Sequence, residues 1–284
     1  MDTNQVDTLL SQAAAGLKAG GCTQSSGLDA EVLLAHVLGC TRGWLRGHGE
    51  HEVPDALKER YAALLARRER GEPLAYIVGS REFWSMPLAV GPGVLVPRPE
   101  TELLVELALA LPLPGSARVL DLGTGSGAIA LALARERPTW AVCATDLSPE
   151  ALAIAHTNCA AMGLAVELLQ GSWLQPVAGR QFELIVSNPP YIATDDPALS
   201  DPALRHEPSM ALTSGPDGLT ALREIIHAAP GHLTGGGWLL LEHGATQAHA
   251  VQRELAARGL IEVRSHADLS GHLRVSGARR ALST

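Results

Sequence analysis

Residues 182–192, FELIVSNPPYI, join a strand-like run to an unusual end. The apolar, β-branched residues indicate a buried strand, which stops at an amide, two prolines and a tyrosine. Because Pro189 and Pro190 have no backbone N–H, the turn offers carbonyl acceptors and few donors, and Asn188 can add a side-chain carbonyl. Such a turn suits an uncharged ligand group that carries N–H hydrogens. Asn188, Pro189, Pro190 and Tyr191 are therefore the candidate catalytic and substrate-binding residues.

A glycine-rich segment, DLGTGSGA at residues 121–128, follows the strand-like run ARVLDL. Glycines allow a tight turn and a close approach of the backbone to a ligand. The same letters fit the G-x-G-x-x-A pattern of dinucleotide sites, so that reading and a purely structural turn stay open. A carboxylate at Asp121 would repel a pyrophosphate but attract the ammonium and sulfonium groups of S-adenosylmethionine. The segment thus favours the methyl donor, and the candidate cofactor-binding residues are Asp121, Gly123, Thr124, Gly125, Ser126 and Gly127.

The next strand-like run, AVCATD, ends in Asp146, whose carboxylate suits a ribose diol in either reading. We add the following residue, Leu147, to the cofactor-binding candidates. In a doubly wound sheet, the strand that ends at Asn188 would lie beside the strand that carries the glycine loop. The loop and the proline turn are therefore expected to face one cleft, which makes Asn188 a cofactor neighbour as well.

The elements that must position these residues fall into three regions with different hydrophobic patterns. From residue 6 to about residue 70, apolar residues recur at helical spacing, as in VDTLLSQAAAGL. Residues 71–97 are short and strand-like, with a Gly-Pro-Gly turn at 91–93, and predict a hairpin. From residue 100 onward strands and helices alternate, which predicts an α/β fold with a doubly wound parallel sheet. The expected domains are a helical domain at 1–72, a β-hairpin linker at 73–98 and a catalytic domain at 99–284.

Length and charge narrow the function classes. The chain has 284 residues, 46% of them hydrophobic, a net charge of -8 and a sequence pI of about 5.7. Its basic residues are scattered, the densest group being ARRER at 66–70, which weighs against nucleic-acid binding without excluding a local basic groove. No apolar run approaches the roughly 20 residues that span a bilayer. We expect a cytoplasmic protein, without membrane association and monomeric.

The cysteines and histidines show no metal-binding pattern. Neither C-x-x-C nor H-E-x-x-H occurs among them. We therefore expect reduced thiols and no metal. The four cysteines are Cys22, Cys40, Cys143 and Cys159.

The motifs resemble a known family. DLGTGSG followed by SNPPYI is similar to the class I S-adenosylmethionine-dependent methyltransferases that modify planar nitrogens. The segment at 71–106, GEPLAYIVGSREFWSMPLAVGPGVLVPRPETELLVE, resembles the protein-(glutamine-N5) methyltransferases that act on peptide chain release factors. The likeness covers effectively the whole chain, and PRPETE at 97–102 is its most specific piece, since related ribosomal-protein glutamine methyltransferases have a serine after the arginine. Ser172 departs from the acid that many relatives have there, whereas Trp173 is retained as the adenine neighbour.

This resemblance implies a seven-stranded Rossmann-like methyltransferase sheet and an activity. S-adenosylmethionine would methylate the side-chain amide nitrogen of the glutamine in the Gly-Gly-Gln motif of class 1 release factors. The Asn188 side-chain carbonyl and the Pro189 backbone carbonyl would each accept one N–H of that amide. The helical domain would bind a second surface of the release factor, and the long connection at 192–217 would form the cleft rim.

Several alternatives stay open. Tyr191, Phe83 or Trp84 could wall the amide, although the last two are expected to be core residues. A histidine base, His206 or His243, is not needed by the chemistry. The rival functions are methylation of a ribosomal-protein glutamine, N6-adenine methylation of a nucleic acid, which can use the same Asn-Pro-Pro-Tyr turn, and binding of a partner without catalysis.

Overall fold

The computed structural model describes residues 4–21 and 25–282, which form two compact units. Unit 1 comprises Met1–Gly79 and Ser200–His206, and unit 2 comprises Ser80–Leu199 and Glu207–Thr284. Our domain boundaries, after residues 72 and 98, stay a prediction.

Unit 1 is helical in its described residues. On α1 (Val6–Ala19), Val6, Leu9, Ala13 and Leu17 are buried at spacings of three and four, which places them on one helix face. Its other helices are α2 (Ser26–Leu38), α3 (Arg42–Gly47), α4 (Asp55–Glu69), α5 (Leu74–Val78) and the 3-10 turn η4 (Leu204–His206).

The buried core of unit 1 contains one anchored tyrosine. Tyr61 of α4 is 2% exposed, and its hydroxyl donates to the Ala30 carbonyl of α2 at 3.0 Å. Because a buried hydroxyl without a partner is costly, this bond fixes how α4 packs on α2.

The predicted hairpin is present but shorter than expected. Strands β1 (Ser80–Phe83) and β2 (Met86–Ala89) pair antiparallel around Trp84 and Ser85, which have φ values of 52° and 53°. The turn of the hairpin therefore lies at these two residues. The predicted Gly-Pro-Gly turn is also present, but it follows β2, and its Gly91 carbonyl accepts from Val94 N at 3.1 Å.

The start of the segment that we read as strand-like is helix α5 instead. Its apolar run is too short for periodicity to separate a strand from a buried helical turn. In the structure, Pro73 precedes the helix, and its carbonyl accepts from the N–H of Tyr76 at 2.9 Å.

Unit 2 contains the predicted doubly wound sheet, of seven strands in its described residues. The strand order is β5-β4-β3-β6-β7-β9-β8, parallel except for the antiparallel β9 between β7 and β8. β6 pairs with β3, so the strand before the proline turn does lie beside the strand before the glycine loop, as predicted. The strands are β3 (Arg118–Leu122), β4 (Ala141–Asp146), β5 (Glu167–Gln170), β6 (Phe182–Ser187), β7 (Leu233–Glu242), β8 (Ile261–Ala267) and β9 (Leu273–Arg279).

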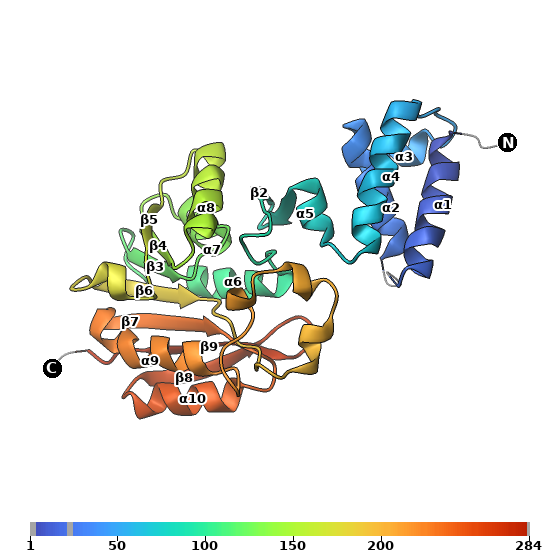
Figure 1. Ribbon diagram of the computed structural model, residues 1–284. Coiled ribbons are helices and arrows are strands. Elements are labelled where there is room, and N and C mark those ends of the chain that lie inside the picture. The colour runs from blue at the N-terminus through green and yellow to red at the C-terminus, as the bar shows by residue number, and fades with distance from the viewer. Residues whose placement is uncertain (1–3, 22–24, 283–284) are drawn as a thin grey trace. The chain divides into compact units, whose positions relative to one another are not determined.

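Helices cover both faces of this sheet, with α6, α7 and α8 on one face and α9 and α10 on the other (Figure 1). These helices are α6 (Glu102–Ala110), α7 (Ala128–Glu136), α8 (Pro149–Met162), α9 (Thr220–His232) and α10 (Ala248–Ala257). The short 3-10 turns are η1 (Pro99–Thr101), η2 (Gln175–Val177), η3 (Pro197–Ser200) and η5 (Ser209–Ala211).

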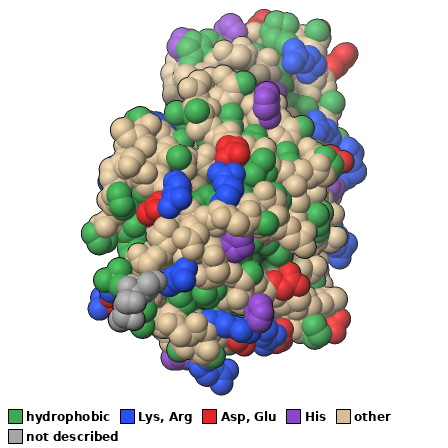
Figure 2. All heavy atoms as spheres, turned by 90° about the vertical axis from the view of Figure 1, so that its left-hand side faces the viewer, with side chains coloured by type: hydrophobic (Ala, Val, Ile, Leu, Met, Phe, Trp, Pro, Cys, Tyr) green, Lys and Arg blue, Asp and Glu red, His purple; other side chains and the backbone are tan. Residues whose placement is uncertain are grey.

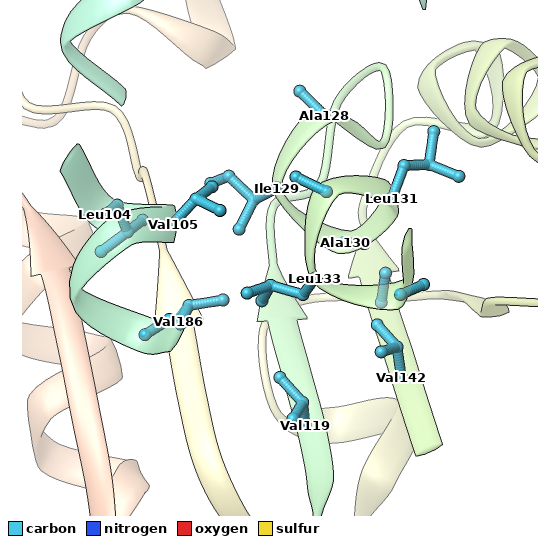
Figure 3. Close-up of a cluster of buried hydrophobic side chains, with 14 of the residues drawn as sticks. Leu104, Val105, Val119, Ala128, Ile129, Ala130, Leu131, Leu133, Val142 and Val186 are labelled. Atoms are coloured by element: carbon cyan, nitrogen blue, oxygen red, sulfur yellow. The ribbon is translucent and has the colours of Figure 1, made fainter. Parts of the chain in front are cut away.

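Successive side chains of β3 pack into opposite layers, because a strand alternates its faces. Val119 lies among the side chains of α6 and α7, as Figure 3 shows, whereas Leu120 and Leu122 lie on the side of α9 and α10. Burial on both faces fixes the end of β3, and with it the start of the glycine loop.

Candidate active site

A cavity of about 320 Å³ lies at the carboxyl ends of the strands in unit 2. Ligands of doubly wound sheets bind at this edge. The residues that line it include nine of our site candidates, Gly123, Thr124, Gly125, Ser126, Asp146, Leu147, Trp173, Asn188 and Pro190, and also Ser172. The structure therefore brings the glycine loop and the start of the proline turn to one cavity.

The glycine loop depends on backbone conformations that other residues rarely adopt. Gly123, Gly125 and Gly127 have φ values of +68°, +57° and +85°. A Cβ on Gly125 would meet nothing within 4 Å, whereas a Cβ on Gly123 would lie 3.1 Å from the ring of Trp173. A side chain at 125 would thus project into open space, and one at 123 would displace the tryptophan.

Asp146 lies at the end of β4 and is tied to the loop by backbone hydrogen bonds. Its Oδ2 accepts from Gly125 N at 2.8 Å and its Oδ1 from Ser148 N at 2.9 Å. Burial raises the pKa of this carboxyl, and the hydrogen bonds from the backbone oppose the shift. Each oxygen retains a lone pair with which it can accept a ligand hydroxyl.

Asp121 is placed differently from the other loop residues. Its carboxyl is fully buried, and Oδ2 accepts from the Thr124 hydroxyl at 2.6 Å. Oδ1 has no hydrogen-bond partner among the described residues. Burial raises the pKa of Asp121 to about 7. Asp121 does not line the cavity in the described part of the chain, so direct contact between this carboxyl and a cofactor stays a prediction.

Trp173 forms a wall of the cavity. Its φ of +46° is unusual for a large residue, and its carbonyl accepts from the Thr145 hydroxyl at 2.9 Å. The ring nitrogen donates to Glu224 Oε2 at 2.9 Å. These two contacts hold the indole against the loop, and its role as an adenine neighbour stays a prediction.

The proline turn directs its residues to different places. Asn188 lines the cavity, and its Nδ2 donates to the Thr101 hydroxyl at 3.1 Å. Pro189 is buried, and its carbonyl has no hydrogen-bond partner in the described part of the chain. Tyr191 packs beside the core of α9 and α10, and its carbonyl accepts from Gln247 Nε2 at 2.9 Å.

The remaining aromatic and histidine candidates have structural contacts. Phe83 is 1% exposed in the core, and Trp84 donates its ring N–H to Glu136 Oε1 at 3.0 Å. His243 is buried with its two ring nitrogens 2.9 Å from the Gly244 carbonyl and 2.8 Å from the Ser276 hydroxyl. The expectation of a core residue is confirmed for Phe83, whereas Trp84 is only partly buried and packs against that core. His206 belongs to unit 1 and contacts the Arg70 carbonyl at 3.4 Å.

Sequence reasoning missed several residues that line the cavity. Pro97, Arg98 and Thr101 come from the PRPETE segment, which we used to compare families but not to predict the site. Arg98 Nη2 binds Glu207 Oε1 at 2.6 Å, and Glu207 also accepts from Val96 N at 3.0 Å. The end of the long connection, Pro208, Met210, Ala211 and Thr213, lines the cavity as the rim prediction required.

On the face drawn in Figure 2, basic side chains are interspersed with acidic ones. In unit 2, Arg118 pairs with Glu183 and Arg180 with Glu167, each at 2.7 Å. Where such pairs form, the positive charge is locally neutralised.

The described residues contain no cluster of three or more His, Cys, Asp or Glu side chains that could hold a metal. Cys40, Cys143 and Cys159 are free thiols, and Cys22 lies outside the described residues. Within the described ranges, no helix has the length and apolar character needed to cross a membrane.

Solved structures support the fold. A methyltransferase from Pyrococcus furiosus aligns with 76% of this chain and 99% of its own, with a TM-score of 0.57 at 19% identity. A T. thermophilus 16S rRNA methyltransferase in complex with AdoMet and guanosine aligns with 71% of this chain and 49% of its own, with a TM-score of 0.53 at 20% identity.

Sequence comparisons extend over both units. Residues 8–79 match the family model of the PrmC N-terminal domain, and residues 99–202 match that of the methyltransferase small domain. The release factor glutamine methyltransferase of Pseudomonas aeruginosa is 50% identical over 253 residues, which cover 89% of this chain and 92% of that protein. That of Vibrio cholerae is 46% identical over 273 residues, or 95% of each chain. The chain therefore belongs to the release factor glutamine methyltransferase family.

Proposed function

We propose that this enzyme transfers a methyl group from S-adenosylmethionine to the side-chain amide nitrogen of the glutamine in the Gly-Gly-Gln motif of class 1 release factors. The family to which the chain belongs supports this proposal, because the names of its relatives include both the release factor and the glutamine. Because release factors act in translation, the reaction would take place in the cytoplasm. The monomeric state expected from the sequence stays a prediction.

The residues present fit S-adenosylmethionine. The cavity falls in the usual size range of small-molecule sites, about 300–1,000 Å³. Asp146 offers carboxylate oxygens for ribose hydroxyls, Trp173 offers an aromatic face, and the open space beside Gly125 leaves room for the cofactor. When bound, S-adenosylmethionine supplies a methyl group on a positively charged sulfur.

The observation that carries the acceptor proposal is the orientation of Asn188. Its Nδ2 is used by Thr101, so its Oδ1 is the free end of the amide. The backbone carbonyl of Pro189 is also without a hydrogen-bond partner in the described part of the chain, and neither proline contributes an N–H. Two acceptors beside each other match the two N–H groups of a primary amide.

These acceptors would do their work by positioning. The lone pair of an amide nitrogen is delocalised into its carbonyl, which makes the nitrogen a poor nucleophile. If Asn188 and Pro189 each accept one N–H, the lone pair is directed toward the methyl carbon. The new N–C bond then forms as the S–C bond breaks, and the nitrogen releases one proton to water.

The helical unit and the rim would select the protein substrate. Residues 1–72 would bind a second surface of the release factor while its glutamine enters the cavity. The rim would lie beside the entering loop, because Pro208 and Met210 line the same cavity.

The test is transfer of a labelled methyl group to a purified class 1 release factor. Wild-type release factor should be labelled, and one whose motif glutamine is replaced by alanine should not. Duplex and single-stranded DNA and ribosomal protein serve as competing substrates. Labelling of DNA or of a ribosomal protein in place of the release factor would contradict the proposal, and isothermal titration without S-adenosylmethionine binding would show a non-catalytic domain.

A further inference from the structure

Thr101 makes a contact that its position in the chain does not require. It directly precedes α6, where a threonine commonly caps the helix with its hydroxyl. Here the side chain makes no capping hydrogen bond, although it is only 4% exposed. The hydroxyl instead accepts from Asn188 Nδ2, a residue 87 positions further along the chain.

The hydrogen bond from Asn188 uses the oxygen of the Thr101 hydroxyl as its acceptor. Because its oxygen accepts from Asn188, its own proton is available for a second acceptor. The carboxyl of Glu242 at the end of β7 is close enough to the Thr101 hydroxyl for this hydroxyl to lower its pKa. Thr101 and Glu242 thus contact neighbouring residues of the proline turn, because Thr101 binds Asn188 and Glu242 binds the Tyr191 hydroxyl.

Glu242 is an unusual residue for its surroundings. It is 1% exposed, and burial raises its pKa to about 7. Oε1 accepts from the Tyr191 hydroxyl in a long bond of 3.4 Å, and Oε2 has no hydrogen-bond partner among the described residues. Arg274 and Glu100 are the charged groups that act on it from β9 and η1. A buried carboxyl so incompletely satisfied calls for a reason other than stability.

The two ends of an asparagine amide have nearly the same shape, so only hydrogen bonding decides which end faces a ligand. A flipped Asn188 would present its NH2 to the NH2 of the substrate, and the two donors would repel. The proline turn cannot correct such a flip from its own backbone, because two of its residues have no N–H.

We propose that Thr101 is a positioning residue which fixes the Asn188 amide so that Oδ1 faces the substrate amide, and that Glu242 supports it by holding Tyr191 of the same turn. This inference rests on the proposed function and adds to it: specificity for a primary amide is set by a buried hydroxyl and a buried carboxyl that contact the proline turn. Thr101 also lines the cavity, so the experiments below separate its effect through Asn188 from a direct effect on the ligand.

The first experiment is a double-mutant cycle on single-turnover methyl transfer, with S-adenosylmethionine affinity measured for each variant. Thr101→Val should reduce transfer by about 10- to 50-fold and leave cofactor affinity within about twofold. In the Asn188→Ala background, the same change should have less than about a twofold effect, because no amide remains to be oriented. Thr101→Ser retains the hydroxyl and should restore most of the rate, and Glu242→Gln should fall between the two.

The matched control is Ser276→Ala, which removes another fully buried hydroxyl of unit 2. Ser276 forms hydrogen bonds with His243 and Ser265, and none with the proline turn among the residues that the structure describes. This variant should transfer within about twofold of wild type. Thermal melts establish that each variant is folded. Equal losses from Thr101→Val with and without Asn188 would overturn the proposal, since that result is the mark of a general structural effect.

The second experiment reads the contact without catalysis. In 15N spectra, the Asn188 side-chain NH2 signals are assigned by their loss in Asn188→Ala. They should shift and exchange faster with solvent in Thr101→Val and in Glu242→Gln, but not in Ser276→Ala. Unchanged signals in both variants would overturn the proposal. If the wild-type enzyme fails to methylate the glutamine, the proposed function fails, whereas these spectra still decide whether Thr101 and Glu242 hold the amide.

Discussion

The glycine loop and the proline turn lie at the ends of adjacent strands but are held in place by different means. The loop is shaped by local backbone, with three glycines at positive φ and Gly125 N bound to Asp146. The turn has no such backbone donors, and its functional amide is held by Thr101, 87 residues away. A loop that wraps a cofactor can be built from neighbouring residues, whereas an amide that must face one way needs partners from other elements.

The largest expected effect concerns the glycine loop, which is shaped by its own backbone. Gly125→Val should weaken S-adenosylmethionine binding at least about 100-fold, because the side chain would enter the cavity and because positive φ strains a β-branched residue. Isothermal titration measures the affinity, with circular dichroism to establish the fold.

Gly163→Val is the control for strain alone. Gly163 ends α8 with a φ of +63°, and a Cβ there would also meet nothing within 4 Å, but it does not line the cavity in the described residues. This variant should lose stability and still bind. If both variants bind equally, the loop does not surround the cofactor.

Asn188→Ala tests the proline turn. Methyl transfer should fall by at least about 100-fold, since the side-chain acceptor that positions the amide is lost. Cofactor affinity should change by less than about twofold, because the loop and Asp146 are untouched. Asn188→Asp retains an acceptor oxygen but adds a charge, and we expect an intermediate loss. Transfer by Asn188→Ala at the wild-type rate would reduce the turn to a strand terminator.

Asp146→Ala should weaken S-adenosylmethionine binding by about 1.5–3 kcal/mol, or about 10- to 150-fold, through loss of charge-assisted hydrogen bonds. Part of this loss would come from the loop, because the carboxylate also holds Gly125 N and Ser148 N. Asp146→Asn separates the contributions, as it keeps one acceptor oxygen. Unchanged titration curves for a folded Asp146→Ala protein would refute the assignment.

The last prediction concerns stability and pH and not binding or methyl transfer. The pKa of Glu242 is raised by burial to about 7 in the folded protein, from an ordinary value of 4.5. Between these pH values the folded state retains a proton that the unfolded state has released, so this group makes stability fall as pH rises. Glu242→Gln removes that dependence. The stability of the variant relative to wild type should therefore increase from pH 4.5 to pH 7, by up to about 3 kcal/mol.

Denaturant unfolding at several pH values measures this difference. Asp121, whose pKa is also raised to about 7, is present in both proteins and cancels in the comparison. If the difference in unfolding free energy between the two proteins does not change with pH, Glu242 has an ordinary pKa. That result would contradict the assignment of a buried carboxyl at this position.

The doubly wound sheet, the pairing of the two site strands and the two motifs were predictable because their signals are local, whereas the antiparallel β9 between β7 and β8 was not predicted. Alternating strands and helices indicated a doubly wound sheet, and the structure confirms it, including the pairing of β6 with β3. Helix α5 was missed, since a five-residue apolar run carries too little periodicity. The position of Asp121 beneath the loop, bound to Thr124, also could not be predicted, because burial depends on what packs over the strand end.

The sequence by itself determined which residues can do chemistry: glycines that permit a tight loop, prolines that remove donors, and an asparagine that supplies an acceptor. Only the tertiary structure decided which way that asparagine faces. Thr101 looks like a helix cap in the sequence, and Glu242 like the end of a strand, yet Thr101 binds Asn188 and Glu242 binds Tyr191 of the same turn. Hydrogen-bond direction depends on partners that only packing of η1, β6 and β7 brings together, and no local pattern encodes that meeting.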